Sequence, residues 1–145
     1  MNKLFICWLI HFPGVLQGLL NLYSVTALWR EENKPMEVTQ TQQDGIVILG
    51  LKGRLDSNTS DDFEKKLLGL ILAGETRLVL DFKELDYISS AGLRVLLKAA
   101  KELKRNNGRL AFCCLKDYIR EIFELSGFVS FFPIHATLEE SLMAS

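Results

Sequence analysis

Residues 78–105 contain, in this order, a strand-like segment, two adjacent small hydroxyl residues and a long amphipathic segment. The first of these, Leu78 to Phe82, is an apolar run typical of a buried strand. Beyond Ser89 and Ser90, apolar residues recur at intervals of three and four, the period of a helix with one buried face. The members of this stripe are Leu93, Leu96, Leu97, Ala100 and Leu103. The succession predicts a strand that passes into a helix through a turn over residues 86–91.

The end of this helix and the strand after it are also marked. Asn106 and Asn107 lead to Gly108, a residue that can take the left-handed conformation just past a last helical turn. Residues 109–115 then have the apolar character of a second strand. A strand, a helix and a strand in this order predict a crossover that joins two parallel strands. The basic residues of the helix lie off the stripe and are expected to face water or a partner: Arg94, Lys98, Lys101, Lys104 and Arg105.

The segments before this unit predict a hairpin and another helix. Strands over residues 37–43 and 46–52 are joined by Asp44 and Gly45, a pair that strongly favours a two-residue turn. Thr59 or Ser60 can cap the helix that follows, which ends at Gly74. The residues of this helix that are expected to face inward are Phe63, Leu67, Leu70 and Ile71.

Two short helices complete the expected domain. Apolar residues between Ile119 and Phe123 predict a helix that stops near Gly127. Thr137 followed by Glu140 is a capping-box pattern for a last helix from Leu138 to about Met143. The expected fold class is α/β, a two-layer domain in which a mixed sheet of four to five strands packs against about four helices.

Composition allows one globular domain over residues 36–145 and argues against a nucleic-acid binder. The chain of 145 residues is 48% hydrophobic and 24% charged, which is enough apolar material to bury a core. The part from Met36 onward carries 14 Lys and Arg, because Lys3, Arg30 and Lys34 precede it, against 16 Asp and Glu, because Glu31 and Glu32 precede it. Its net charge of −2 offers no basic face for phosphates.

The two serines stand where the chemistry of a helix start matters. The first helical turn carries unpaired backbone N–H groups and the positive end of the helix dipole. A hydroxyl there can simply cap the helix, which is the simpler interpretation of Ser90 from spacing alone. The same position also tolerates a phosphate, because the free donors and the dipole favour an anion.

The chain resembles the STAS domain of bacterial anti-sigma factor antagonists, and the fold that this implies is STAS-like. The resemblance covers residues 36–145 and rests on the order and spacing of several segments, none of them diagnostic alone. These segments are residues 51–56 with Gly53, residues 79–82, residues 87–93, residues 108–110, residues 122–128 and residues 132–134.

The resemblance implies that a serine just before the first helical turn is phosphorylated by a partner kinase. The family's common motif is Asp-Ser-Ser-Gly, in which the first serine is modified. Alignment on Gly92 and Leu93 places Ser90 at the modified position, Ser89 at that of the aspartate and Ala91 at that of the second serine. Ser90 is therefore the predicted phosphorylation site, with Ser89 as the second choice. The missing acidic residue is a departure from the motif and leaves open which kinase acts here.

The implied function is that of an anti-sigma factor antagonist, a protein-binding module switched by phosphorylation. In its unphosphorylated form it binds an anti-sigma factor serine kinase of the GHKL type and releases the sigma factor. A PP2C-type phosphatase would reverse the modification. Asp56, Ser57 and Asn58 also have an ordinary role in helix-entry turns. The expected partner-binding residues are Arg54, Asp56, Ser57, Asn58, Thr59, Asp86, Tyr87, Ser89, Ser90, Ala91, Gly92 and Arg94.

Two other functions are compatible with a STAS domain, because a fold does not fix a function. One is a constitutive, non-catalytic subunit of a lipid-transport ATPase, in which serine chemistry plays no part. The other is a scaffold in a stressosome-like signalling assembly. A pull-down that returned an ATPase would favour the first, and a large particle in size-exclusion chromatography would favour the second.

The sequence gives little support to an enzyme. Ser90 lacks the Gly-x-Ser-x-Gly elbow, and its nearest candidate base, His135, is remote in sequence. No Gly-rich phosphate loop is present, so no nucleotide cofactor is expected and phosphate should come from a partner.

The cysteines indicate no metal site and give no reason to place the domain outside a reducing cytoplasm, the expected location. Cys113 and Cys114 are adjacent in an expected strand and should point to opposite faces. No His cluster accompanies them, so a role as small buried apolar residues is expected. The third cysteine, Cys7, lies in the N-terminal extension.

Residues 1–35 form an apolar extension for which three interpretations stay open. A membrane anchor or secretory signal would make the membrane a partner, and residues 25–27 resemble a site that signal peptidase accepts. An additional helix is the second. The third is that the segment is not translated, because Met36 stands where a family member would begin and residues 30–32 could be encoded by a purine-rich ribosome-binding sequence. A peptide spanning residues 32–38 in mass spectra would exclude initiation at Met36.

Overall fold

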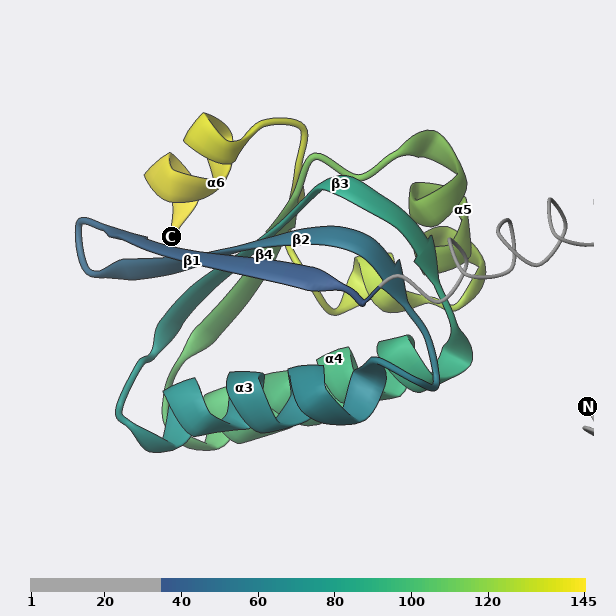
Figure 1. Cartoon of the computed structure of the whole chain (residues 1–145). Helices are drawn as coiled ribbons and strands as arrows, with labels where there is room; N and C mark the ends of the chain where they lie inside the picture. Colours follow the sequence, from purple (N-terminus) through teal and green to yellow (C-terminus); the bar gives the residue numbers. More distant parts are fainter. Residues whose placement is uncertain (1–34) are drawn as a thin grey trace, which may run out of the picture. The chain divides into compact units, whose positions relative to one another are not determined.

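The strand β3 lies at the centre of a five-stranded sheet in the computed structural model, which describes residues 35–145 (Figure 1). The order across the sheet is β1-β2-β3-β4-β5, in which β1 runs antiparallel to β2 and every other neighbouring pair is parallel. The strands are β1 (Glu37–Gln43), β2 (Ile46–Leu55), β3 (Arg77–Ile88), β4 (Arg109–Cys113) and β5 (Ile134–His135). The predicted hairpin and the parallel crossover from β3 to β4 are confirmed.

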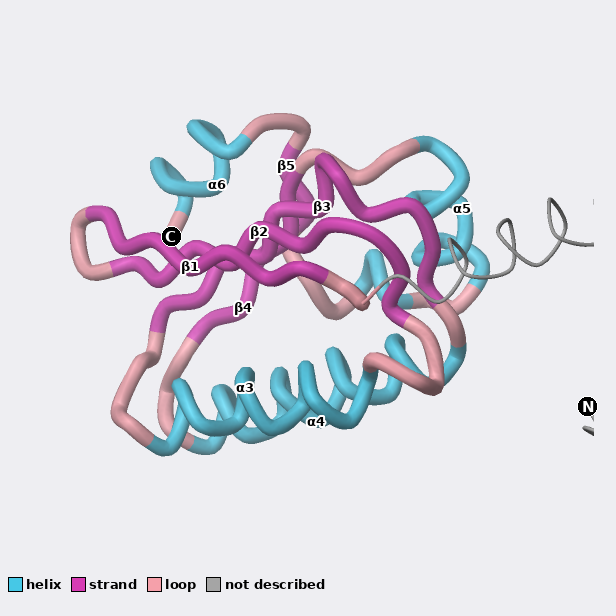
Figure 2. Tube along the Cα trace, viewed as in Figure 1, coloured by secondary structure: helices cyan, strands magenta, loops and turns pink. Residues whose placement is uncertain are grey.

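The helices cover both faces of this sheet. Figures 1 and 2 show α3 and α4 side by side beneath one face, with α6 above the other. The helices are α3 (Ser60–Leu72), α4 (Ser90–Arg105), α5 (Asp117–Leu125) and α6 (Leu138–Ala144), with a 3-10 turn, η1 (Phe128–Ser130). The expected α/β fold, with its mixed sheet and four α-helices, is confirmed. The predicted two-layer arrangement did not include a helix on the second face, which α6 covers through Leu138 and Leu142.

Alternation along the strands builds two separate apolar clusters. Val47 and Leu49 of β2 belong to the larger core, which includes residues of α3, α4 and α5. Ile46 and Ile48 belong to the smaller cluster on the other face, where Leu138 packs from α6. Residues 46–49 are all buried, because both faces of β2 are covered here. This explains why the sequence is continuously apolar at these positions and does not alternate.

The buried face of α4 differs from the predicted stripe. Val95 and Ala99 are buried, whereas Leu97 is 37% exposed and Ala100 is half-buried. The buried set begins with Gly92, which lies against the sheet, and continues at helical spacing through Val95, Leu96, Ala99 and Leu103, so only Leu96 and Leu103 of the predicted stripe are fully buried. The close approach of Gly92 to Leu55 and Ile88 turns this side of the helix towards the sheet. The basic residues of the helix are exposed, as predicted: Arg94, Lys98, Lys101, Lys104 and Arg105.

The end of α4 uses its asparagine and glycine in a way that differs from the prediction. Asn107 takes the left-handed conformation, with φ of 54°. Gly108 is needed for close approach instead, since an added Cβ would lie 2.7 Å from both Leu103 Cδ2 and the carbonyl oxygen of Thr76. At the hairpin, Asp44 and Gly45 have φ of 52° and 75°, as the predicted two-residue turn requires.

The apolar extension that precedes the predicted domain start at Met36 lies outside the described residues, apart from residue 35. The three interpretations of residues 1–35, including the cleavage site at residues 25–27, therefore stay predictions. Within residues 35–145, no helix is both long enough and apolar enough to cross a membrane.

Candidate functional site

The carboxyl ends of β2 and β3 lie next to each other at one edge of the sheet. Arg54 is in register with Tyr87, and Leu55 with Ile88. Because the two strands are parallel, the segments that leave them, residues 56–59 and the start of α4, meet at this edge. The structure thus brings together the two groups of predicted partner-binding residues, which are far apart in the sequence.

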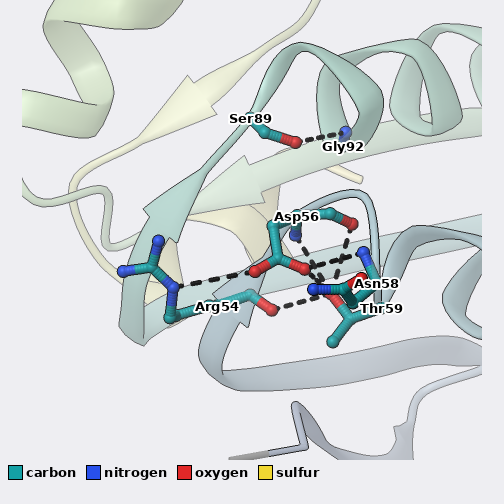
Figure 3. A network of polar contacts seen from close by, with 6 residues as sticks. All are labelled: Arg54, Asp56, Asn58, Thr59, Ser89 and Gly92. Atoms are coloured by element: carbon teal, nitrogen blue, oxygen red, sulfur yellow. Dashed lines mark hydrogen bonds and ion pairs between the residues drawn. The ribbon is translucent and has the colours of Figure 1, made fainter. Parts of the chain in front are cut away.

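Ser89 is the only residue between β3 and α4, so the predicted turn over residues 86–91 is wrong. Asp86 and Tyr87 belong to the strand, and Ser90 begins the helix. The amide of Ser89 donates to the carbonyl of Leu55 at 2.9 Å. Its Oγ accepts from the amide of Gly92 at 3.4 Å, which makes Ser89 the helix cap (Figure 3).

Ser90 is left free by this arrangement. It is the first residue of α4 and is exposed. Within residues 35–145, neither its amide nor that of Ala91 has a hydrogen-bond acceptor. Arg94 is exposed one turn further along, at the i+4 position. The site can therefore hold an anion on Ser90 at the positive end of a helix, with a cation one turn away.

Thr59 organises the loop between β2 and α3. Its hydroxyl accepts from the amide of Asp56 at 3.0 Å and donates to the carbonyl of Arg54 at 2.8 Å (Figure 3). Thr59 occupies the N-cap position, but its side chain makes no capping bond to the helix. The predicted N-cap position at Thr59 is thus correct. The predicted capping hydrogen bond is absent from the described part of the chain, because the hydroxyl is used to close the loop between Arg54 and Asp56.

Asp56 and Arg54 extend this loop towards β3. Asp56 Oδ1 accepts from the amide of Asn58 at 2.9 Å, which is an ordinary turn contact. Its Oδ2 lies 3.7 Å from Nε of Arg54 (Figure 3). The guanidinium of Arg54 lies 4.1 Å from the centre of the Tyr87 ring. The edge therefore presents a cation, a carboxylate and an aromatic ring in fixed positions.

Asp86 is hydrogen-bonded by two residues that the sequence analysis did not identify. Lys116 Nζ donates to Asp86 Oδ1 at 2.6 Å, and the hydroxyl of Tyr118 donates to the carbonyl of Asp86 at 2.8 Å. The hydrogen bond to Asp86 raises the pKa of Lys116. Lys116 follows β4, the parallel neighbour of β3, so its position after a strand was a usable signal. Asp86 is thus a strand residue whose side chain and carbonyl group are both hydrogen-bonded, and it is not a free turn residue.

Residues 37–141 match the family model of the STAS domain. The chain belongs to the STAS domain family. BtrV of Bordetella bronchiseptica, named as an anti-sigma factor antagonist, is 44% identical over 109 residues, covering 75% of this chain and 94% of BtrV. The anti-sigma F factor antagonist of Paenibacillus polymyxa is 27% identical over 101 residues, covering 69% of this chain and 86% of that protein. These names describe regulatory proteins, not enzymes.

A solved structure supports the fold of this STAS domain. SpoIIAA of Bacillus in its phosphorylated form superposes with a TM-score of 0.61 at 24% identity, covering 75% of this chain and 97% of that one. The recognised family and the expected STAS-like fold are therefore confirmed.

The cysteines of the STAS domain lie differently from the prediction. Cys113 is the last residue of β4 and is fully buried, while Cys114 lies beyond the strand with φ of 60°. Strand alternation therefore stops before Cys114, and the two thiols do not point to opposite faces. The sulfur atoms of both cysteines lie close to a carboxylate oxygen of Asp81, and all three atoms are of a kind that can bind a metal ion.

Proposed function

We propose that this STAS domain is an anti-sigma factor antagonist that binds its anti-sigma factor through the edge described above and is released by phosphorylation of Ser90. The observation that carries the proposal is the division of roles between the serines. Ser89 is engaged as the cap of α4, whereas Ser90 is exposed at the start of the same helix. A modifying enzyme can reach Ser90 without breaking a contact of the fold.

The fold should tolerate the phosphate. Phosphorylation adds a charge of about −1.5 to −2. At the first residue of α4 this charge meets the free amides and the positive end of the helix dipole. The guanidinium of Arg94 is within reach one turn later, at the spacing of stabilising side-chain pairs on a helix.

The bound partner should not tolerate it. The proposed contact surface consists of residues 54–59, Asp86, Tyr87 and the first turn of α4 with Arg94, so Ser90 lies within it. A phosphate there would be buried against the partner or placed near its acidic groups, which can cost several kcal/mol. Since about 1.4 kcal/mol is a tenfold change in affinity, one phosphate is enough to end binding.

The partners follow from the same proposal. The anti-sigma factor would itself be a serine kinase of the GHKL type, a PP2C-type phosphatase would restore the free serine, and the exchange would take place in a reducing cytoplasm. The replacement of the family's aspartate by Ser89 means that the kinase must recognise a neutral cap.

Incubation of the full chain with a GHKL-type anti-sigma kinase and ATP tests the proposal, followed by mapping of the phosphopeptide. Phosphate should appear on Ser90 in the wild type and be absent in Ser90→Ala. Ser89→Ala should still accept it. Modification of Ser89, or retained labelling of Ser90→Ala, would move or remove the site.

A second measurement separates the switch from simple unfolding. Ser90→Asp should lose binding to the kinase by at least about tenfold while keeping the circular-dichroism spectrum and melting temperature of the wild type. Equal affinity of Ser90→Asp and wild type would contradict the switch. Recovery of a lipid-transport ATPase or a large signalling particle in place of the kinase would contradict the proposed partner.

A further inference from the structure

Asp81 of β3 and Cys113 of β4 are register partners in neighbouring parallel strands. Paired residues of adjacent strands point to the same face of a sheet, so the carboxylate and the thiol lie side by side. Cys113 belongs to the smaller apolar cluster, on the face opposite α3 and α4. This face is away from the helix pair that includes Ser90.

Cys114 adds a second thiol because its backbone leaves the strand. Its φ of 60° is uncommon for a residue other than glycine, and it ends the alternation of side chains. The amide of Cys114 donates to the carbonyl of His135 at 3.2 Å, which holds the bend against β5. As a result, a carboxylate oxygen of Asp81 and the sulfurs of Cys113 and Cys114 all lie within 4.8 Å of one another.

We propose that Asp81, Cys113 and Cys114 form a binding site for one Zn²⁺ ion. Thiolate sulfur and carboxylate oxygen are both ordinary zinc ligands, and a site with three protein ligands keeps its fourth position for water or another group. Zinc bonds of about 2.3 Å to sulfur and 2.0–2.2 Å to oxygen place tetrahedral ligand atoms about 3.6–3.8 Å apart. The distances between the three ligand atoms, each no more than 4.8 Å, therefore need to shorten by at most about 1 Å, which is within the range of small side-chain rotations.

The surroundings favour such a site. The amide of Lys83 donates to Asp81 Oδ1 at 2.9 Å and so orients the carboxylate, as outer partners of metal ligands commonly do. Leu138 and Leu142 of α6 pack on the cluster and limit the access of water. Asp81 and Cys114 are only half-buried, which leaves a route for the ion to enter. Bound zinc would join β3 to β4 and stabilise the face that α6 covers.

Zinc binding must release protons. Burial, together with the charge of Asp81, raises the pKa of both thiols, so the metal-free protein holds them protonated at neutral pH. One Zn²⁺ and two thiols then give two bound thiolates and two protons, while the carboxylate binds without losing one. The other titratable groups nearby are Glu139 of α6, whose charge acts on Cys113, and His135, its register partner in β5. Affinity should rise with pH because the released protons are taken up by the solvent.

Titration of the full, reduced chain with Zn²⁺, and with Co²⁺ as a spectroscopic probe, tests this site. We expect one ion per chain, a cobalt–thiolate charge-transfer band, a higher melting temperature with zinc and the release of two protons. Cys114→Ala and Asp81→Asn should each weaken zinc binding by at least about tenfold. Cys7→Ser is the matched control and should bind as the wild type does.

The outcomes that overturn the proposal are equally specific. Absence of a charge-transfer band at equimolar cobalt, or zinc affinity unchanged in both Cys114→Ala and Asp81→Asn, would exclude the site. Asp81→Asn conserves volume, so it keeps the test valid if Cys114→Ala folds poorly. Ser90→Asp should bind zinc normally, which separates this site from the proposed switch.

Discussion

Gly92 lies directly against Leu55, at the point where α4 meets the end of β2. A Cβ added at Gly92 would come within 2.8 Å of Leu55 Cγ and 2.9 Å of its carbonyl oxygen. That carbonyl cannot move away, because it accepts the hydrogen bond from the amide of Ser89. The contact therefore fixes how closely the first turn of α4 approaches the sheet.

Gly92→Ala should consequently lower the free energy of unfolding by about 1–3 kcal/mol, the usual cost of overpacking. The measurement is urea unfolding of the full chain followed by circular dichroism. Gly69→Ala is the matched control, because Gly69 lies in α3 with nothing within 4 Å of an added Cβ. Alanine there should stabilise the helix by about 0.5–1 kcal/mol. The same sign for both variants would contradict the packing argument.

The two serines should respond differently to alanine. Ser89→Ala removes the hydroxyl that caps Gly92 and should cost about 1 kcal/mol of unfolding free energy. Ser90→Ala removes an exposed side chain at the first helical position and should leave stability within about 0.5 kcal/mol of the wild type. The midpoints of urea unfolding of the two variants and the wild type provide the comparison, provided that the dependence of the unfolding free energy on urea concentration is unchanged. A larger loss in Ser90→Ala would show that Ser90 is needed for the fold and would argue against its proposed freedom.

Thr59→Val should open the loop before α3. The change removes a hydroxyl that serves the amide of Asp56 and the carbonyl of Arg54, and it should cost about 1–3 kcal/mol. Amide hydrogen exchange at residues 56–60 should speed up in this variant. Thr59→Ser keeps the hydroxyl and should restore slow exchange. If Thr59→Val exchanges as slowly as the wild type while Thr59→Ser exchanges faster, the β-branched shape of Thr59 matters and its hydrogen bonds do not.

Stability should fall at alkaline pH because of Cys113. In the metal-free protein, burial raises the pKa of its thiol, so the folded protein keeps a proton that the unfolded chain loses above about pH 8.5. The stabilising effect is complete below that pH and decreases as pH rises towards the folded-state pKa, by at most about 1.4 kcal/mol per pH unit. Urea unfolding between about pH 7.5 and 9.5 should show this slope. Cys113→Ala should reduce this slope, with the remainder due to Cys114, whose thiol pKa is also raised by burial. An equal slope in both proteins would refute the assignment.

The sequence predicted most of the fold because strand and helix boundaries carry strong local signals. Asp44 and Gly45 specified the hairpin, and the helix period located α4. The extent of β3 was missed because its second half does not alternate: Leu85 and Ile88 are both buried although they are three residues apart. A shift in the pairing with β2, between Gly53 and Arg54, changes the phase of the strand. Single-sequence periodicity cannot detect such a shift.

The candidate site was predicted less completely, since contacts between segments depend on sheet register. Lys116 and Tyr118 reach Asp86 only because β4 lies beside β3. The bend at Cys114 was also hidden, because cysteine gives no local signal for a positive φ. Residues near one another in the chain, such as Ser89 and Gly92, were the ones that spacing could relate.

The junction of one residue between β3 and α4 has a consequence for any enzyme that acts at Ser90. The backbone of Ser90 is already helical and anchored at Ser89, so it cannot be drawn out as an extended strand into a peptide-binding groove. Such an enzyme has to accept a three-dimensional epitope assembled from distant parts of the chain. A short synthetic peptide with the same local sequence would then be a poor substrate, and unfolding of the domain would abolish recognition before it exposed the serine further.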